Sequence, residues 1–218
     1  MTSPAESHAG ARGRRRARRG EGELLRDEIL DAAQALLVEH GTADAVTIRA
    51  VAERVGVSAP SIYLHFHDKD DLFYEACVRR FARLASTLQE AIAGSATVVE
   101  RLRLLGHAYM AYGLSDPGEY LVLFGTETPS AVLAGKMEND PGIRAFQLLV
   151  DVLEEGVRNG ELRPGLDPVA TAVSVWGAVH GAVMLLITKG DLRPHMPIPP
   201  DEVVVETVLD LLLDAVTV

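Results

Sequence analysis

The segment from Thr47 to Phe66, TIRAVAERVGVSAPSIYLHF, decides the fold of the N-terminal part of the chain. Thr47 is a good N-cap for a short helix whose apolar residues recur at helical spacing. Gly56 allows the backbone to turn with a positive φ, and Ser58 can cap a second short helix that tolerates Pro60 in its first turn. Two short helices joined by a tight turn around a glycine form a helix-turn-helix.

The second helix of this motif is expected to present its first residues to the major groove of DNA, while Ile62 and Phe66 face the core. The outward residues carry small hydroxyl groups, a methyl group and a phenol, which suit phosphate oxygens and thymine methyl groups. They are Ser58, Ala59, Ser61 and Tyr63. None of them is a strong bidentate reader of a base, so Arg49 is the best candidate for reading a guanine.

This part of the chain resembles the TetR family of transcriptional regulators over roughly residues 24–85. The resemblance is carried by Thr47, Arg49, Val51, Ala52, Gly56, Val57, Ser58, Ser61, Tyr63, His65, Phe66, Lys69 and Leu72. It implies phosphate contacts from Thr47, Tyr63 and Lys69, and a base or phosphate contact from Arg49. It also implies positions on or beside the recognition helix for Ser58, Ala59, Pro60, Ser61 and His65.

The net charge of −10 by itself argues against nucleic acid, but the charge is uneven. Residues 1–20 carry six arginines and one acidic residue, and we interpret them as a disordered basic arm. The arm either contacts phosphates and releases counterions or only solubilises the chain. Residues 21–93 hold seven basic and thirteen acidic residues, so we expect the arm to contribute heavily to DNA affinity. The arginines assigned to DNA are Arg14, Arg15, Arg16, Arg18 and Arg19.

Apolar residues at helical spacing and a low aromatic content of 5% predict an all-α fold. We expect Asp68 to cap a long helix that connects two domains. Further helices are expected near residues 97–114, 117–125, 141–159, 167–189 and 201–216, with breaks at proline and glycine. Three parts follow: the arm at 1–20, a three-helix helix-turn-helix domain with its connecting helix at 21–93, and a C-terminal helical bundle for ligand binding and dimerisation at 94–218.

The stretch from Val169 to Ile187 contains 19 residues without a charge. Its length could cross a membrane, but its polar residues and its unbiased flanks favour a helix that is buried against its own domain and a partner subunit. The last helix, Val203 to Val216, is also apolar nearly all round. Together they predict a four-helix interface in a homodimer. The residues assigned to it are Ser174, Gly177, Gly181, Val204, Val208, Leu211 and Leu212.

A ligand pocket is expected between the helices at 97–125 and 141–189, because apolar walls with a few polar tips suit a small molecule. The candidate lining residues are Tyr109, Met110, Tyr112, Tyr120, Phe124, Phe146, Trp176, His180 and Met184. The alternative is that each of them is ordinary core. For His180 that alternative is a buried side chain that only satisfies a hydrogen bond.

These observations favour a cytoplasmic, homodimeric DNA-binding regulator, a repressor that a small and largely apolar effector releases from a pseudo-palindromic operator. The alternative is a helical DNA-binding or protein-interaction scaffold without an effector. The sequence has no nucleophile elbow, no HExxH motif and no P-loop, so an enzyme is not favoured. No cofactor or membrane partner is expected. His65 and His67 lack a third ligand, so no metal site is expected either.

Overall fold

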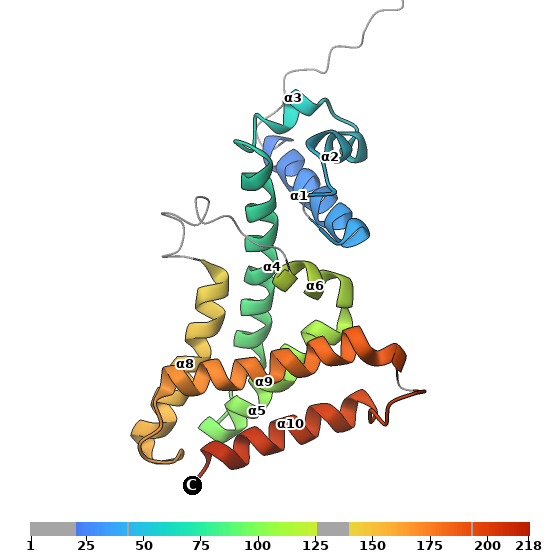
Figure 1. Ribbon diagram of the computed structural model, residues 1–218. Coiled ribbons are helices and arrows are strands. Elements are labelled where there is room, and N and C mark those ends of the chain that lie inside the picture. Colours follow the sequence, from blue (N-terminus) through green and yellow to red (C-terminus); the bar gives the residue numbers. More distant parts are fainter. Residues whose placement is uncertain (1–20, 43, 126–139, 193) are drawn as a thin grey trace, which may run out of the picture.

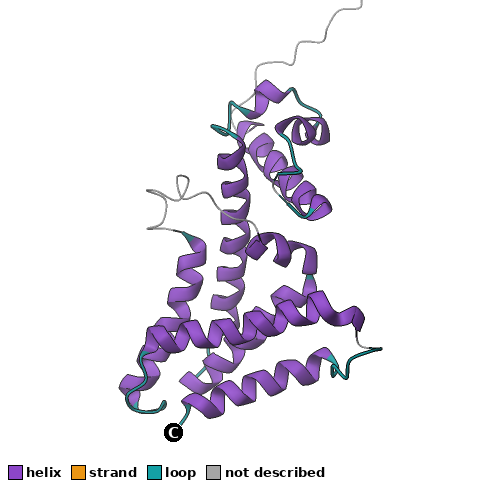
Figure 2. Cartoon of the chain, in the orientation of Figure 1, coloured by secondary structure: helices purple, strands orange, loops and turns teal. Residues whose placement is uncertain are grey.

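The computed structural model describes residues 21–42, 44–125, 140–192 and 194–218 (Figure 1). Helices dominate these ranges, and the β-type pairing within them is a single bridge between Leu162 and Thr217 (Figure 2). The all-α prediction is therefore confirmed, while the basic arm lies outside the described residues. The helices are α1 Glu21–His40, α2 Ile48–Val55, α3 Ala59–Ile62, α4 Lys69–Ala91, α5 Val98–Ser115, α6 Pro117–Gly125, α8 Pro141–Asn159, α9 Pro168–Lys189 and α10 Asp201–Val216, with the short 3-10 helix Gly190–Leu192 after α9.

Local capping sets both ends of α2 and the start of α4 as the sequence predicts. The hydroxyl of Thr47 accepts a hydrogen bond from the amide of Ala50 at 3.1 Å, which starts α2. Gly56 ends α2 with a φ of +78°, a left-handed conformation that L side chains rarely adopt. The carboxylate of Asp68 starts α4 by accepting from the amide of Asp71 at 2.8 Å. In the C-terminal half, the observed helix ends lie within one residue of the predicted ones.

The helix-turn-helix has a hydrophobic core of its own, which α1, α2, α3 and the first turns of α4 enclose. Its fully buried members include Ile29, Val51, Ile62 and Leu72. Val122, from α6, is also part of this core although it lies far along the chain. The helix α6 therefore contacts the N-terminal core directly.

A second core lies in the C-terminal bundle among α4, α5, α6, α8, α9 and α10. Leu84 and Leu88, near the end of α4, belong to this core, whereas Leu72 belongs to the first one. In Figure 1, α4 runs from the helix-turn-helix into the bundle, and α9 and α10 lie next to each other across its far end. Two elements, α4 and α6, thus join the two cores.

The helix α9 is long and apolar enough to cross a membrane by its length and composition. One of its faces packs on α5, α8 and α10, where Ala172 and Val183 are fully buried. The opposite face is open in the single chain, with Val173 and Leu185 exposed.

Candidate DNA-binding surface and ligand cavity

Of the residues predicted to face outward around the short helix α3, Ser58 and Tyr63 are exposed, whereas Ala59 and Ser61 are half-buried. Ile62 and Phe66 anchor the helix in the core with 0% and 2% of their surface exposed. Tyr63 is 55% exposed and Leu64 is 84% exposed. Leu64 was not among the predicted residues. The sequence could have indicated its exposure, because Leu64 follows Tyr63 and lies two positions after the buried Ile62. At helical spacing this places an apolar side chain on the outward face.

Ser58 occupies the predicted N-cap position of α3, but its side chain makes no capping hydrogen bond. Its hydroxyl oxygen lies 2.8 Å from that of Ser61 instead, so the expectation of a side-chain cap is wrong. Ala59 and Ser61 are half-buried, whereas Ser58 and Pro60 are exposed.

The cations beside α3 are held only by weak interactions. Arg49 forms an exposed ion pair with Glu53 at 2.9 Å, and such pairs contribute little in water. The ammonium of Lys69 lies 5.4 Å from the ring centroid of Phe73. Thr47 uses its hydroxyl oxygen as an acceptor in the cap, which leaves the hydroxyl hydrogen available as a donor. Thr47 and Arg49 are exposed and Lys69 is half-buried, and their phosphate contacts stay predictions.

The two histidines after α3 have separate roles. His65 is half-buried with its ring against Phe66, at a centroid distance of 6.5 Å. His67 bonds the carboxylate of Asp68 at 2.9 Å, and this hydrogen bond raises the pKa of His67. Among the described residues, no group of three or more His, Cys, Asp or Glu side chains could hold a metal ion.

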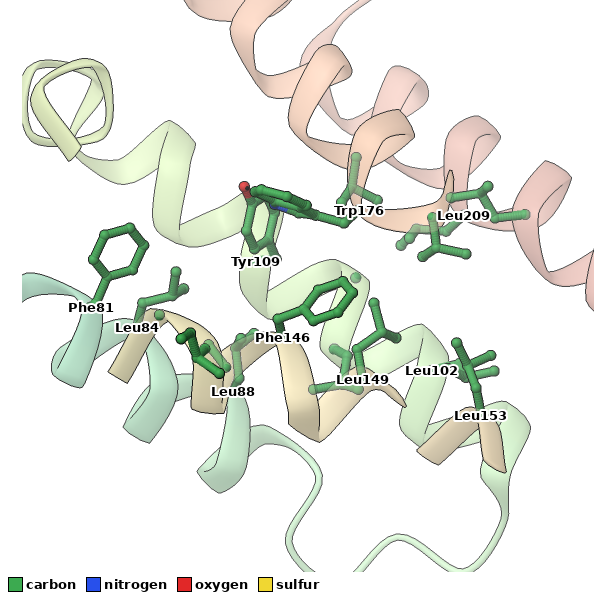
Figure 3. A pocket seen from close by; sticks show the side chains of 18 of the residues that line it. Phe81, Leu84, Leu88, Leu102, Tyr109, Phe146, Leu149, Leu153, Trp176 and Leu209 are labelled. Atoms are coloured by element: carbon green, nitrogen blue, oxygen red, sulfur yellow. Dashed lines mark hydrogen bonds between the residues drawn. The ribbon is translucent and has the colours of Figure 1, made fainter. Parts of the chain in front are cut away.

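The bundle contains an apolar cavity of about 420 Å³, within the usual range for small-molecule sites (Figure 3). Four of the predicted residues line it: Tyr109, Phe124, Phe146 and Trp176. The prediction also missed much of the wall, because α4 and α10 contribute to it. These further lining residues include Phe81, Leu84, Leu88, Leu209, Leu212, Leu213 and Val216.

The other five predicted residues do not line the cavity, and their packing explains why. Met110 is fully buried in the core, and Met184 is half-buried against it. Tyr112 instead donates a long hydrogen bond to the carbonyl of Arg80 at 3.5 Å. Tyr120 and His180 belong to a hydrogen-bonded cluster beside the cavity.

This cluster connects two residues of the cavity wall to α6. The indole N–H of Trp176 donates to the hydroxyl of Tyr109 at 3.0 Å, and that hydroxyl lies 2.9 Å from the hydroxyl of Tyr120. Nδ1 of His180 lies 2.6 Å from the hydroxyl of Tyr120 and 3.1 Å from that of Tyr109. Burial raises the pKa of Tyr120 and lowers the pKa of His180, so both groups are held neutral. His180 is half-buried and hydrogen-bonded within this cluster, and its contact with a ligand stays a prediction.

A buried arginine joins α1, α4 and α6 where the two cores meet. Arg80 is 2% exposed, and its guanidinium lies 3.3 Å from the carboxylate of Glu119, which is 23% exposed. The same guanidinium donates to the carbonyl of Glu119 at 3.3 Å and to that of Gln34 at 3.5 Å. Close by, a Cβ on Gly118 would lie 2.7 Å from Cγ1 of Val38, so α6 approaches α1 closely.

Comparison with known proteins identifies the fold and the family. Residues 29–76 match the family described as bacterial regulatory proteins, tetR family, and residues 102–212 match the tetracyclin repressor-like C-terminal domain. The chain belongs to the TetR family of transcriptional regulators. It is thus a DNA-binding transcriptional regulator.

Proteins similar to this chain have different functions. The fatty acid metabolism regulator protein of Bacillus subtilis is 23% identical over 157 residues, which cover 72% of this chain and 80% of that protein. The nucleoid occlusion factor SlmA of Marinobacter nauticus is 31% identical over 179 residues, covering 77% and 86%. The structure of the regulator FadR from Bacillus subtilis in complex with stearoyl-CoA superposes with a TM-score of 0.72 at 22% identity, covering 86% of this chain and 97% of that one.

TetR-family regulators bind DNA as dimers, and most residues predicted for the dimer interface are accessible in the single chain. Gly177 and Gly181 face open space, Ser174 and Leu211 are exposed, and Val204 and Val208 are half-buried. Leu212 differs, because its side chain lines the cavity. Leu212 is half-buried in the single chain, and its assignment to the dimer interface stays a prediction.

Proposed function

We propose that this protein is a homodimeric repressor that binds a pseudo-palindromic operator in the cytoplasm and is released by a small, largely apolar effector. The observation that carries the proposal is the cavity of about 420 Å³ in the bundle, whose wall is connected through Tyr109 and Tyr120 to α6. The similar FadR structure is a complex with stearoyl-CoA, which supports an effector with a long apolar chain.

In this proposal residues 21–93 form the DNA-binding domain, and residues 94–218 bind the effector and the partner subunit. Two α3 helices of a dimer would enter successive turns of the major groove. Their hydroxyl groups, together with Arg49 and Lys69, would contact phosphates and base edges. The arginines at 14–19 would add phosphate contacts, although they lie outside the described residues.

The effector would act by favouring a different spacing of the two DNA-binding domains. It can shift the population only through its different affinity for the two states. Both α4 and α6 can transmit the change, because each contacts both cores. Reciprocity then requires operator DNA to weaken effector binding by the factor by which the effector weakens operator binding.

A cavity-filling variant tests the proposal. Ala145 lines the cavity, whereas Gln147, two residues away on the same helix, is exposed. We expect Ala145→Trp to abolish the response of operator binding to an apolar effector, measured by fluorescence anisotropy with DNA that flanks the gene. Gln147→Trp is the control and should respond like the wild type. A full response of the Ala145→Trp variant would refute the placement of the effector.

The second candidate is a DNA-binding scaffold without an effector, and the 31% identity to a nucleoid occlusion factor favours it. Thermal unfolding separates the two. A ligand that binds only the folded state at a hundredfold excess over its Kd stabilises by about 2.7 kcal/mol. If apolar compounds leave the Tm unchanged while operator DNA still binds, the scaffold is the better description.

A further inference from the structure

The cavity wall changes in character along its length. Phe81 lies at one end beside Leu84, whereas Tyr109, Phe146 and Trp176 lie in the middle, and Leu102 and Leu153 lie at the other end (Figure 3). The lining residues of α8 run from Gly142 to Leu153, which corresponds to about 16 Å at the rise of an α-helix. An elongated apolar space of this kind suits an extended hydrocarbon chain.

The polar atoms of the aromatic wall are already satisfied within the protein. The indole N–H of Trp176 donates to Tyr109, and the hydroxyl of Tyr109 is shared with Tyr120 and His180. A ligand that needed a hydrogen bond here would have to break one of these contacts. The wall therefore selects for hydrocarbon rather than for a ligand with polar substituents along its length.

The start of α8 would attract an anionic head group if its amides were free, but Asp140 occupies that position. One carboxylate oxygen of Asp140 accepts from the amides of Gly142 at 2.7 Å and Ile143 at 3.4 Å. The other accepts from the hydroxyl of Tyr74 at 3.2 Å. Burial and the charge of Asp140 raise the pKa of Tyr74 to about 12, so Tyr74 remains a protonated donor to this carboxylate.

A free fatty acid would therefore bring a second carboxylate next to Asp140, the one charged residue among the described residues of the wall. It would lose its hydration without gaining a free donor there, and the like charge would repel it. Resting on the proposed function, we propose that the cavity takes a straight hydrocarbon chain with an uncharged linkage, such as an alcohol, an ester or a thioester, and discriminates against the free acid through Asp140.

Trp176 makes the test direct, because it is the single tryptophan of the chain and lines the cavity. Its fluorescence is titrated in the full-length protein with decanol, methyl decanoate and decanoate, at mildly alkaline pH and below micelle formation. We expect the alcohol and the ester to bind at least about tenfold more tightly than the acid. Equal binding of acid and alcohol would overturn the proposal.

A charge-neutral variant separates the effect of Asp140 from the ordinary preference of carboxylates for water. Asp140→Asn keeps a side chain that can cap α8 and accept from Tyr74, and Asp140→Ser is a second variant with a good N-cap. We expect the acid-to-alcohol ratio of Kd values to fall by about threefold to tenfold in both, as for removal of a like charge several ångströms away. Asp167→Asn, the matched change at the N-cap of α9 outside the cavity wall, should leave the ratio unchanged.

The outcomes distinguish this inference from the proposed function. If the ratio does not change in either Asp140 variant, Asp140 does not select the head group and the inference fails, while an effector cavity remains. If none of the three compounds changes the fluorescence of Trp176 or the Tm, the cavity is not an apolar effector site and the proposed function fails as well.

Discussion

The substitution Glu119→Gln tests whether the buried arginine holds the two cores together. It removes the carboxylate that lies 3.3 Å from the guanidinium of Arg80 and keeps nearly the same side-chain volume. Arg80 then keeps only neutral acceptors, which are the main-chain carbonyls of residues 119 and 34 and the amide oxygen of the new side chain. A buried cation without a counter-charge is costly, because desolvation is no longer offset by a Coulomb attraction.

We expect Glu119→Gln to cost less stability than the loss of one partner from a fully buried ion pair. Removing one partner of a fully buried ion pair costs about 3–5 kcal/mol. Glu119 is 23% exposed and the contacts are long, so water and the two carbonyls recover part of this cost. We therefore expect Glu119→Gln to lower the free energy of unfolding by about 2–3 kcal/mol, which lowers the Tm by roughly 5–10 °C for a chain of this size.

Urea and thermal melts of Glu119→Gln, Arg80→Met and the double variant measure the coupling between the two side chains. The control is Glu155→Gln, which removes the partner of Arg101 from a more exposed pair and should cost about 1 kcal/mol or less. The reasoning is refuted if Glu119→Gln costs no more than this control, or if the coupling energy from the cycle is below about 0.5 kcal/mol.

Further predictions concern DNA, the dimer and pH. Deleting residues 1–19 should weaken operator binding and flatten its salt dependence; an unchanged slope would exclude phosphate contacts by the arm. The double variant Gly177→Leu with Gly181→Leu should yield folded monomers in analytical ultracentrifugation, because both positions are open in the single chain. Burial lowers the pKa of His180 below its ordinary value of 6.5. At a pH below 6.5 the unfolded chain therefore binds more protons at this residue than the folded chain does. Stability should therefore fall as the pH drops through that value, and His180→Gln should show a weaker pH dependence in urea melts. Gly56→Ala, at a φ of +78°, should cost about 1–2 kcal/mol in the same melts.

The helices and their ends could be predicted because their signals are local. Thr47 satisfies an amide three residues away, and the left-handed turn at Gly56 depends on its own backbone. The buried positions of α3 follow in the same way from helical spacing. Each of these features is decided within a few residues of the chain, so one sequence is enough to find it.

The cavity could be predicted only in part, because its wall depends on how distant helices pack. Leucines at helical spacing look the same in a sequence whether they fill a core or border a space, so Leu84 and Leu209 carried no signal. The opposite error occurs at Met110, which was predicted to line the pocket and is fully buried in the core. The burial of Arg80 was also out of reach, because its partner Glu119 is 39 residues away.

Two neighbouring residues of α6 belong to two different networks, the contact with Arg80 and the hydrogen-bonded cluster beside the cavity. Glu119 holds Arg80 at the junction with α1, and the next residue, Tyr120, bonds Tyr109 and His180 beside the cavity. Because adjacent residues of a helix move together, a ligand that displaces the hydroxyl of Tyr109 changes the forces on α6 at the position that contacts Arg80. The helix α4 offers a second short connection, because Phe81 lines the cavity next to Arg80, whose guanidinium donates to the carbonyl of Gln34 in α1. A variant that uncouples the effector from the operator without weakening either binding event is therefore expected at the contact between Arg80 and Glu119, where the two connections meet.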